Sequence, residues 1–123
     1  FVTRRFDQTR ELAAAQPFDF LDRYRTGEHL RYLHKLADWA AARGTAFVLV
    51  DMPVTAALEA KYPAATAEYR TRLAEFAAAR PGVRVLRAER SAVGLGDEHF
   101  ADTIHLNGTG AKVLSAWLRD RLG

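Results

Sequence analysis

The residues best suited to chemistry are an aspartate and a histidine three positions apart, Asp102 and His105. They stand among turn-forming neighbours, in a segment that leads directly into an apolar periodic run. Asn107 suits the first position of a helix there, because its side-chain oxygen can accept hydrogen bonds from free N–H groups of the first turn. We therefore expect the pair to lie on a loop held against a helix start, where catalytic residues are often placed.

An Asp–His pair of this kind is suited to general base catalysis. The carboxylate can accept a hydrogen bond from Nδ1–H, which fixes the tautomer and leaves Nε2 free to take a proton from a hydroxyl. We therefore predict about 2.6–3.2 Å between an Asp102 carboxylate oxygen and Nδ1 of His105. The alternative is structural, because D-x-x-H is a short pattern. In that interpretation Asp102 caps a local turn and His105 is a half-buried loop residue.

The longer string over residues 100–112, F-A-D-T-I-H-L-N-G-T-G-A-K, resembles the last block of the SGNH/GDSL hydrolase and acyltransferase superfamily. Its phenylalanine, its H-L-N run and its helix-opening glycine look most like the DltD-type and AlgJ-type O-acyl-transfer proteins. The resemblance implies that Asp102 orients His105, and that His105 is the general base of a Ser-His-Asp triad. It also implies an ester or glycan substrate and a location outside the cytoplasm.

The family takes its serine nucleophile from a G-D-S-type block that precedes this region. This chain has two serines, Ser91 and Ser115, and neither follows an expected strand in a G-D-S or G-x-S-x-G context. We therefore expect the nucleophile to lie outside the chain and the chain alone to be inactive. Residue 1 is Phe, and the only methionine is Met52. We accordingly expect this sequence to be a piece of a longer protein.

Two other functions remain open. The first is a non-catalytic domain of the same descent that acts as a binding or assembly module. The second is a zinc or manganese site, because carboxylates and imidazoles that suit these metals gather in one segment. Its ligands would be Asp97, Glu98, His99, Asp102 and His105. For the triad we expect neither a metal nor a cofactor.

Composition and charge exclude several classes of protein. Apolar residues make up 49% and charged residues 27% of the 123 positions, as in a globular domain. The net charge is only +3, and the arginines are dispersed rather than interleaved with aromatics, so we expect no nucleic-acid partner. No run approaches the roughly 20 apolar residues of a membrane span. The absence of cysteine excludes disulfides and thiolate metal sites.

Hydrophobic periodicity predicts the elements that position the pair. Helices are expected over 28–43, over 55–80 with an interruption at Pro63, and over 108–122. Leu36 and Trp39 are expected to widen the apolar face of the first helix. Strands are expected over 45–52 and 83–87, and residues 88–99 are expected to form a loop. The first strand is a continuous apolar run, typical of burial on both faces of a parallel sheet. Asp51 at its end is expected to be a turn residue before Pro53; the alternative is an active-site position, because α/β active sites gather at strand ends.

This order predicts an α/β fold, a partial flavodoxin-like or SGNH three-layer architecture with a short parallel sheet flanked by helices. We expect an N-terminal arm or short helices over 1–27, with an aromatic patch at 18–24. Residues 28–123 then form the C-terminal half of an SGNH-like domain. Two parallel strands leave two free edges. We therefore expect the remaining half of the parent domain or a second copy, in a homodimer, as the partner.

Overall fold

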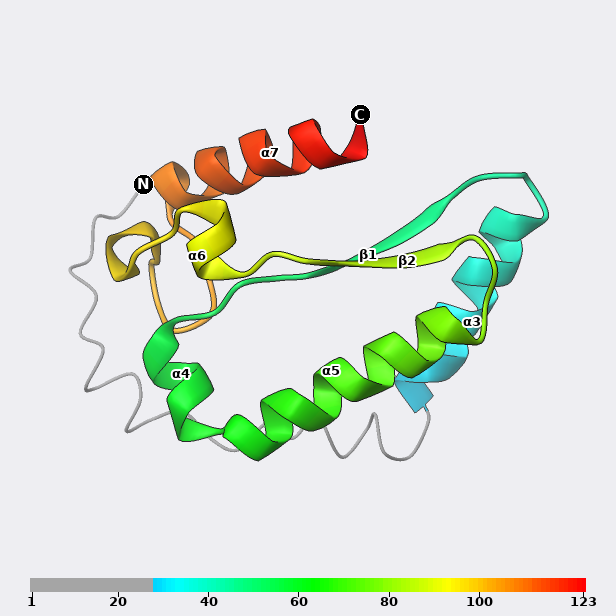
Figure 1. The fold of residues 1–123 in the computed structure, drawn as a ribbon, viewed down its shortest axis with the longest axis horizontal. Coiled ribbons are helices and arrows are strands. Elements are labelled where there is room, and N and C mark those ends of the chain that lie inside the picture. The colour runs from blue at the N-terminus through cyan, green and yellow to red at the C-terminus, as the bar shows by residue number, and fades with distance from the viewer. Residues whose placement is uncertain (1–27) are drawn as a thin grey trace. The chain divides into compact units, whose positions relative to one another are not determined.

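The computed structural model describes residues 28–123 (Figure 1). The predicted arm over 1–27 and its aromatic patch lie outside the described residues. Two compact units share the described part of the chain. The sheet unit comprises 28–51 and 63–87, and the loop unit comprises 52–62 and 88–123. The elements are α3 (Glu28–Ala41), β1 (Phe47–Asp51), α4 (Ala56–Lys61), α5 (Pro63–Ala78), β2 (Val83–Arg87), α6 (Arg90–Val93), the 3-10 turn η1 (Asp97–His99) and α7 (Gly108–Leu122).

In the sheet unit, β1 and β2 form a two-stranded parallel sheet, with Phe47 opposite Val83 and Asp51 opposite Arg87. Helix α3 contacts β1, and helix α5 contacts β2. The break between α4 and α5 falls at Pro63, which begins α5. Proline is favoured at the first helical position, since its missing N–H has no helical partner there. The predicted α/β class, with a short parallel sheet flanked by helices, is confirmed.

The predicted burial of the first strand on both faces is wrong. Residues 47–50 are only half-buried, and Asp51 alone is buried. A sheet of two strands leaves one edge of each strand unpaired among the described residues, so the apolar run is incompletely covered. The prediction that Leu36 and Trp39 widen the buried face of the first helix is also wrong. Ala37 and Ala40 are buried, whereas Leu36 and Trp39 are more than half exposed.

Asp51 is not the turn residue that we predicted. It is the last residue of β1, and its Oδ2 lies 3.3 Å from Nε of Arg70 on α5. The guanidinium neutralises a buried carboxylate, which is expensive to leave unpaired. The sequence does not show this pairing, because strand and helix meet only in the folded unit.

A second polar contact joins the end of α5 to α3. Arg80 donates from Nε to Nδ1 of His34 over 2.8 Å, and its Nη1 pairs with Asp38. The His34 ring also packs against Phe76, with 4.9 Å between the ring centroids. One arginine thus holds the α3 histidine and the α3 carboxylate at the same time.

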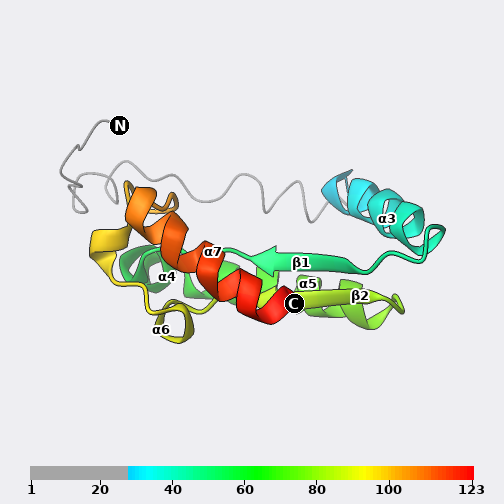
Figure 2. The same ribbon diagram turned by 90° about the horizontal axis from the view of Figure 1, so that it is seen from above.

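The loop unit carries the Asp–His segment. Both α6 and η1 contact α7, and Figure 2 shows these elements from a second direction. The expected loop over 88–99 is therefore partly helical, because two short turns, α6 and η1, interrupt it. The buried apolar side chains of this unit are Leu58, Ala88, Val93, Leu95, Phe100, Leu114 and Trp117.

Candidate active site

Asp102 and His105 form the predicted hydrogen bond. Oδ2 of Asp102 lies 2.7 Å from Nδ1 of His105. The second oxygen, Oδ1, accepts from the backbone N–H of Ile104 at 2.9 Å and from that of His105 at 2.7 Å. One oxygen therefore caps the turn, and the other holds the imidazole. The expected turn cap and the expected Asp–His contact are therefore both present, each on a different oxygen, whereas His105 is not the half-buried residue of the structural alternative.

The carboxylate is held in its ionised form. Partial burial acts to raise the pKa of Asp102, but hydrogen bonds from the Ile104 N–H, the His105 ring and the His105 N–H outweigh it, and the pKa lies below its ordinary value of 3.8. An ionised carboxylate accepts the Nδ1 proton and stabilises an imidazolium when one forms. Asp102 is therefore in the protonation state that a triad requires of its aspartate.

The imidazole is presented to solvent. The side chain of His105 is 70% exposed, and that of Asp102 is 35% exposed. Since Nδ1 is engaged by Asp102, Nε2 is the nitrogen left for chemistry, and no described residue hydrogen-bonds to it. Nε2 therefore lies on the side of the ring that a group from outside the loop can reach.

The loop that carries the pair is closed at its base. Phe100 and Leu106 form an isolated antiparallel bridge, and the N–H of Ala101 donates to the carbonyl of His105 over 2.8 Å. Phe100 is 3% exposed, so its ring anchors the base of the loop. The phenylalanine two residues before the aspartate therefore has a packing role.

The tip of the loop is anchored by Thr55. Both its backbone N–H and its Oγ1 donate to the carbonyl of Thr103, over 3.0 and 3.2 Å. Thr55 has no exposed surface, and Thr103 is 8% exposed. The anchored carbonyl lies between Asp102 and His105 in sequence, so these bonds restrain the turn that brings the two side chains together. The sequence did not indicate Thr55, which precedes α4 and lies 48 positions from Thr103.

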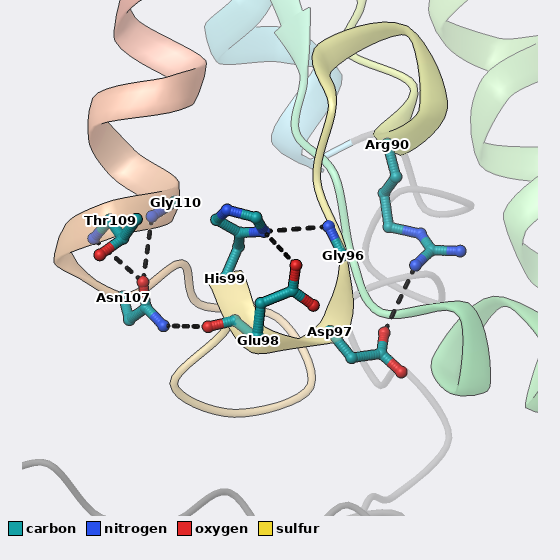
Figure 3. Close-up of polar contacts among 8 residues, drawn as sticks. All are labelled: Arg90, Gly96, Asp97, Glu98, His99, Asn107, Thr109 and Gly110. Carbon is teal, nitrogen blue, oxygen red and sulfur yellow. Dashed lines mark hydrogen bonds and ion pairs between the residues drawn. The ribbon is translucent and has the colours of Figure 1, made fainter.

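Asn107 caps α7 as predicted (Figure 3). Its Oδ1 accepts from the N–H groups of Thr109 and Gly110, each over 3.0 Å. Its Nδ2 donates to the carbonyl of Glu98 over 2.7 Å, and its backbone N–H donates to the carbonyl of His99 over 2.9 Å. One side chain thus fixes the helix start and ties it to η1. His105 leaves the backbone two residues before this fixed point.

The close approach of α7 to η1 requires a glycine. A Cβ at Gly110 would overlap the backbone oxygen of His99. Gly108, two positions earlier, has open space around the same atom. Of the two glycines in the G-T-G run, only Gly110 is therefore required by the close packing of the helix start.

The other acidic and imidazole side chains of the segment make separate contacts of their own (Figure 3). Oδ1 of Asp97 lies 3.4 Å from Nη1 of Arg90. Nδ1 of His99 accepts from the Gly96 N–H over 3.0 Å and lies 3.3 Å from Oε1 of Glu98. The two contacts compete, because a nitrogen that accepts from Gly96 has no proton for Glu98. We assign the bond to Gly96, since it is the shorter and its donor is fixed in the backbone.

The metal-site alternative finds no support in these positions. Within residues 28–123, no three His, Cys, Asp or Glu side chains are grouped so as to hold an ion. Asp102 and His105 bind each other, whereas His99 faces Gly96. The proposed five-ligand set is therefore divided between separate contacts.

Neither serine is placed as a nucleophile in the described structure. Ser91 lies on α6 and Ser115 on α7, both exposed, and no hydrogen bond joins either hydroxyl to His105. Ser115 lies on the exposed face of α7, together with Ala111 and Lys112. Ser91 comes four residues after the end of β2, but neither serine stands in the Gly-x-Ser-x-Gly turn that usually presents an activated serine.

No protein-family model, curated protein or solved structure matches this chain. In the described part of the chain, no helix is both long and apolar enough to cross a bilayer. The features that bear on function are the Asp102–His105 contact and the string that contains it.

Proposed function

We propose that this chain supplies the Asp–His part of a Ser-His-Asp triad in an SGNH-type ester hydrolase or O-acyltransferase, with the serine outside the chain. The observation that carries the proposal is the 2.7 Å contact between Asp102 Oδ2 and His105 Nδ1, on a loop that leaves Nε2 free. The F-A-D-T-I-H-L-N-G-T-G-A-K string supports the family assignment. We also propose that the complete domain has a flavodoxin-like three-layer fold. The described sheet has only two strands, so the rest of such a sheet would come from outside the described residues.

In each half of the proposed reaction His105 moves a proton twice. As the serine Oγ forms a bond to the acyl carbonyl carbon, Nε2 takes the hydroxyl proton, and the ionised Asp102 stabilises the imidazolium. The tetrahedral intermediate then collapses, the ester C–O bond breaks, and Nε2 gives the proton to the leaving alkoxide. Water or a sugar hydroxyl repeats the two steps on the acyl-enzyme. This chemistry needs neither a metal nor a redox cofactor.

The rest of the site is assigned to the partner. The nucleophile and the oxyanion donors would come from the remaining half of the parent domain, since a second copy of this chain would bring only the same two serines. The ester or glycan substrate would bind between the two contributions. Since a general base alone contributes about 10²–10⁴-fold, this chain by itself should give no useful turnover.

The test uses the protein that contains this chain and assays it on a small aryl acetate and on an acetylated sugar. We expect Asp102→Asn to lower kcat by about 10⁴-fold with the fold intact, because an amide in place of the carboxylate selects the wrong tautomer. His105→Ala should abolish turnover. Asp120→Asn is the matched control, since Asp120 is an exposed aspartate of the same unit.

The isolated chain completes the design. It should show no turnover above background, and Ser91→Ala should change nothing. Robust hydrolysis that disappears in Ser91→Ala would place the nucleophile inside the chain. If the longer protein kept full activity with Asp102→Asn and with His105→Ala, this chain would be a non-catalytic module. The absence of a described serine beside His105 is also compatible with that alternative.

A further inference from the structure

Helix α3 carries an apolar face that nothing in the described structure covers. Tyr32, Leu36 and Trp39 are 57%, 52% and 55% exposed. Their spacing of four and then three residues places them on one side of the helix. The buried residues Ala37 and Ala40 lie on a different side. We call Tyr32, Leu36 and Trp39 the α3 face; α3 is labelled in Figures 1 and 2.

Three cations lie beside the aromatic rings of the α3 face. The guanidinium of Arg31 lies 5.1 Å and the ammonium of Lys35 5.7 Å from the centre of the Tyr32 ring. The guanidinium of Arg43 lies 4.0 Å from the centre of the Trp39 ring, and its Nη1 donates to the Trp39 carbonyl. Each cation therefore lies against the aromatic ring nearest to it.

The cations beside the α3 face outnumber the carboxylates of its helix. Helix α3 holds two acidic residues, Glu28 at its first position and Asp38. Asp38 pairs with Arg80 in the sheet unit, so its charge is already neutralised. The α3 face is thus apolar at its centre and positive at its margin, a combination that complements a negatively charged surface with an apolar layer beneath it.

We propose that the α3 face binds the surface of a bilayer that contains anionic headgroups. Tyrosine and tryptophan favour the membrane–water interface, where the ring is buried and the polar end stays hydrated. Leu36 would enter the acyl boundary, while Arg31, Lys35 and Arg43 would meet the headgroup phosphates. The 14 residues of α3 extend about 21 Å, enough for one helix to lie in the interface plane. This proposal concerns the sheet unit and does not depend on the proposed catalytic role.

Two other occupants fit the observations less well. Single-stranded nucleic acid would stack its bases on exposed ring faces, but cations already lie against the rings of Tyr32 and Trp39. A second copy would bring two like-charged margins together, which opposes association. An anionic lipid surface complements both features, because its acyl layer can take up the apolar centre and its headgroups can pair with the positive margin.

The test is flotation of the full 123-residue chain with phosphatidylcholine vesicles, with and without phosphatidylglycerol. We expect binding only to the anionic vesicles, weakened by salt. Leu36→Asp should lower the apparent affinity at least about tenfold, and Arg43→Gln about fivefold for the lost charge. Matched controls on α7, Leu122→Asp and Arg119→Gln, should bind as the unsubstituted chain does, since Leu122 is 49% exposed.

Tryptophan fluorescence gives an independent readout. The chain has two tryptophans, Trp39 and Trp117, of which only Trp39 is exposed. Anionic vesicles should shift the emission to the blue, and Trp39→Phe should remove the shift. Circular dichroism tests whether each variant is folded. If Leu36→Asp is unfolded, the milder substitution Leu36→Ser replaces it.

Three results would overturn the proposal. One is no binding to anionic vesicles at low salt. Another is an equal loss of binding in Leu36→Asp and Leu122→Asp. The third is a dimer in light scattering that Leu36→Asp dissociates, with no binding to vesicles. That result would show that the α3 face mediates contact between two copies of the chain.

Discussion

The loop that carries His105 should depend on one buried hydroxyl. Thr55 precedes α4, where a threonine commonly caps the helix, yet its Oγ1 makes no capping bond and donates to the carbonyl of Thr103 instead. Thr55→Val keeps the shape and removes this donor. The Thr103 carbonyl retains the Thr55 N–H at 3.0 Å, so no buried acceptor is left unpaired. We therefore expect a loss of about 1 kcal/mol, within the range for one hydrogen bond and below the cost of an orphaned group.

The assay separates the loop from the rest of the fold. Urea denaturation gives the global loss, and amide hydrogen exchange gives its distribution. The N–H groups of Ile104 and His105, which donate to Asp102 Oδ1, should exchange about fivefold faster in Thr55→Val, since 1 kcal/mol of local opening corresponds to that factor. Amides in the middle of α7 should change less.

Thr55→Ser is the matched control, because it keeps the hydroxyl and loses a buried methyl group. It should also cost about 1 kcal/mol in global stability, yet leave the exchange of Ile104 and His105 close to that of the unsubstituted chain. Equal acceleration in the Val and Ser variants would refute the anchoring role of Oγ1. So would acceleration spread evenly over the loop unit.

Two further predictions test the electrostatics and packing of the site. Because the pKa of Asp102 is lowered in the folded chain, its contribution to stability is present above about pH 4 and is lost as the pH falls through the lowered folded value. Asp102→Asn should flatten this acid limb in urea denaturation at a series of pH values, and an unchanged limb would contradict the assignment. Gly110→Ala should cost about 1–3 kcal/mol by thermal denaturation, because its Cβ meets the His99 backbone oxygen. Gly108→Ala, with open space around it, should not, and equal effects would show that the close approach is not what selects glycine.

Local features of the site were predictable from the sequence. The contact between Asp102 and His105 spans three positions, and the Asn107 cap spans three, so residue type and spacing are sufficient to indicate both. The two strands and the break at Pro63 follow from apolar runs and from the chemistry of proline. Such features depend on neighbours that the chain supplies within one or two turns.

Long-range features were not predictable in the same way. Thr55 reaches Thr103 across 48 positions, and Arg70 reaches Asp51 across 19. Periodicity showed that α3 has a wide apolar face, but it cannot show how much of that face a two-stranded sheet covers. Leu36 therefore belongs to the apolar pattern of the helix and still lies in solvent.

The two oxygens of the Asp102 carboxylate have different partners, so substitution by asparagine can separate their two roles. Oδ1 accepts two backbone N–H groups, and an amide oxygen can accept the same two. Oδ2 accepts from Nδ1–H, and an amide nitrogen at that position can only donate. Asp102→Asn therefore preserves the turn and forces Nδ1 to accept, so the proton moves to Nε2 and the general base is lost. Asp102→Ala removes both roles, so a loss of activity in that variant could come either from a disrupted loop or from loss of the general base. A large rate effect from asparagine, with the exchange of the Ile104 and His105 amides unchanged, would assign the loss to chemistry rather than to folding.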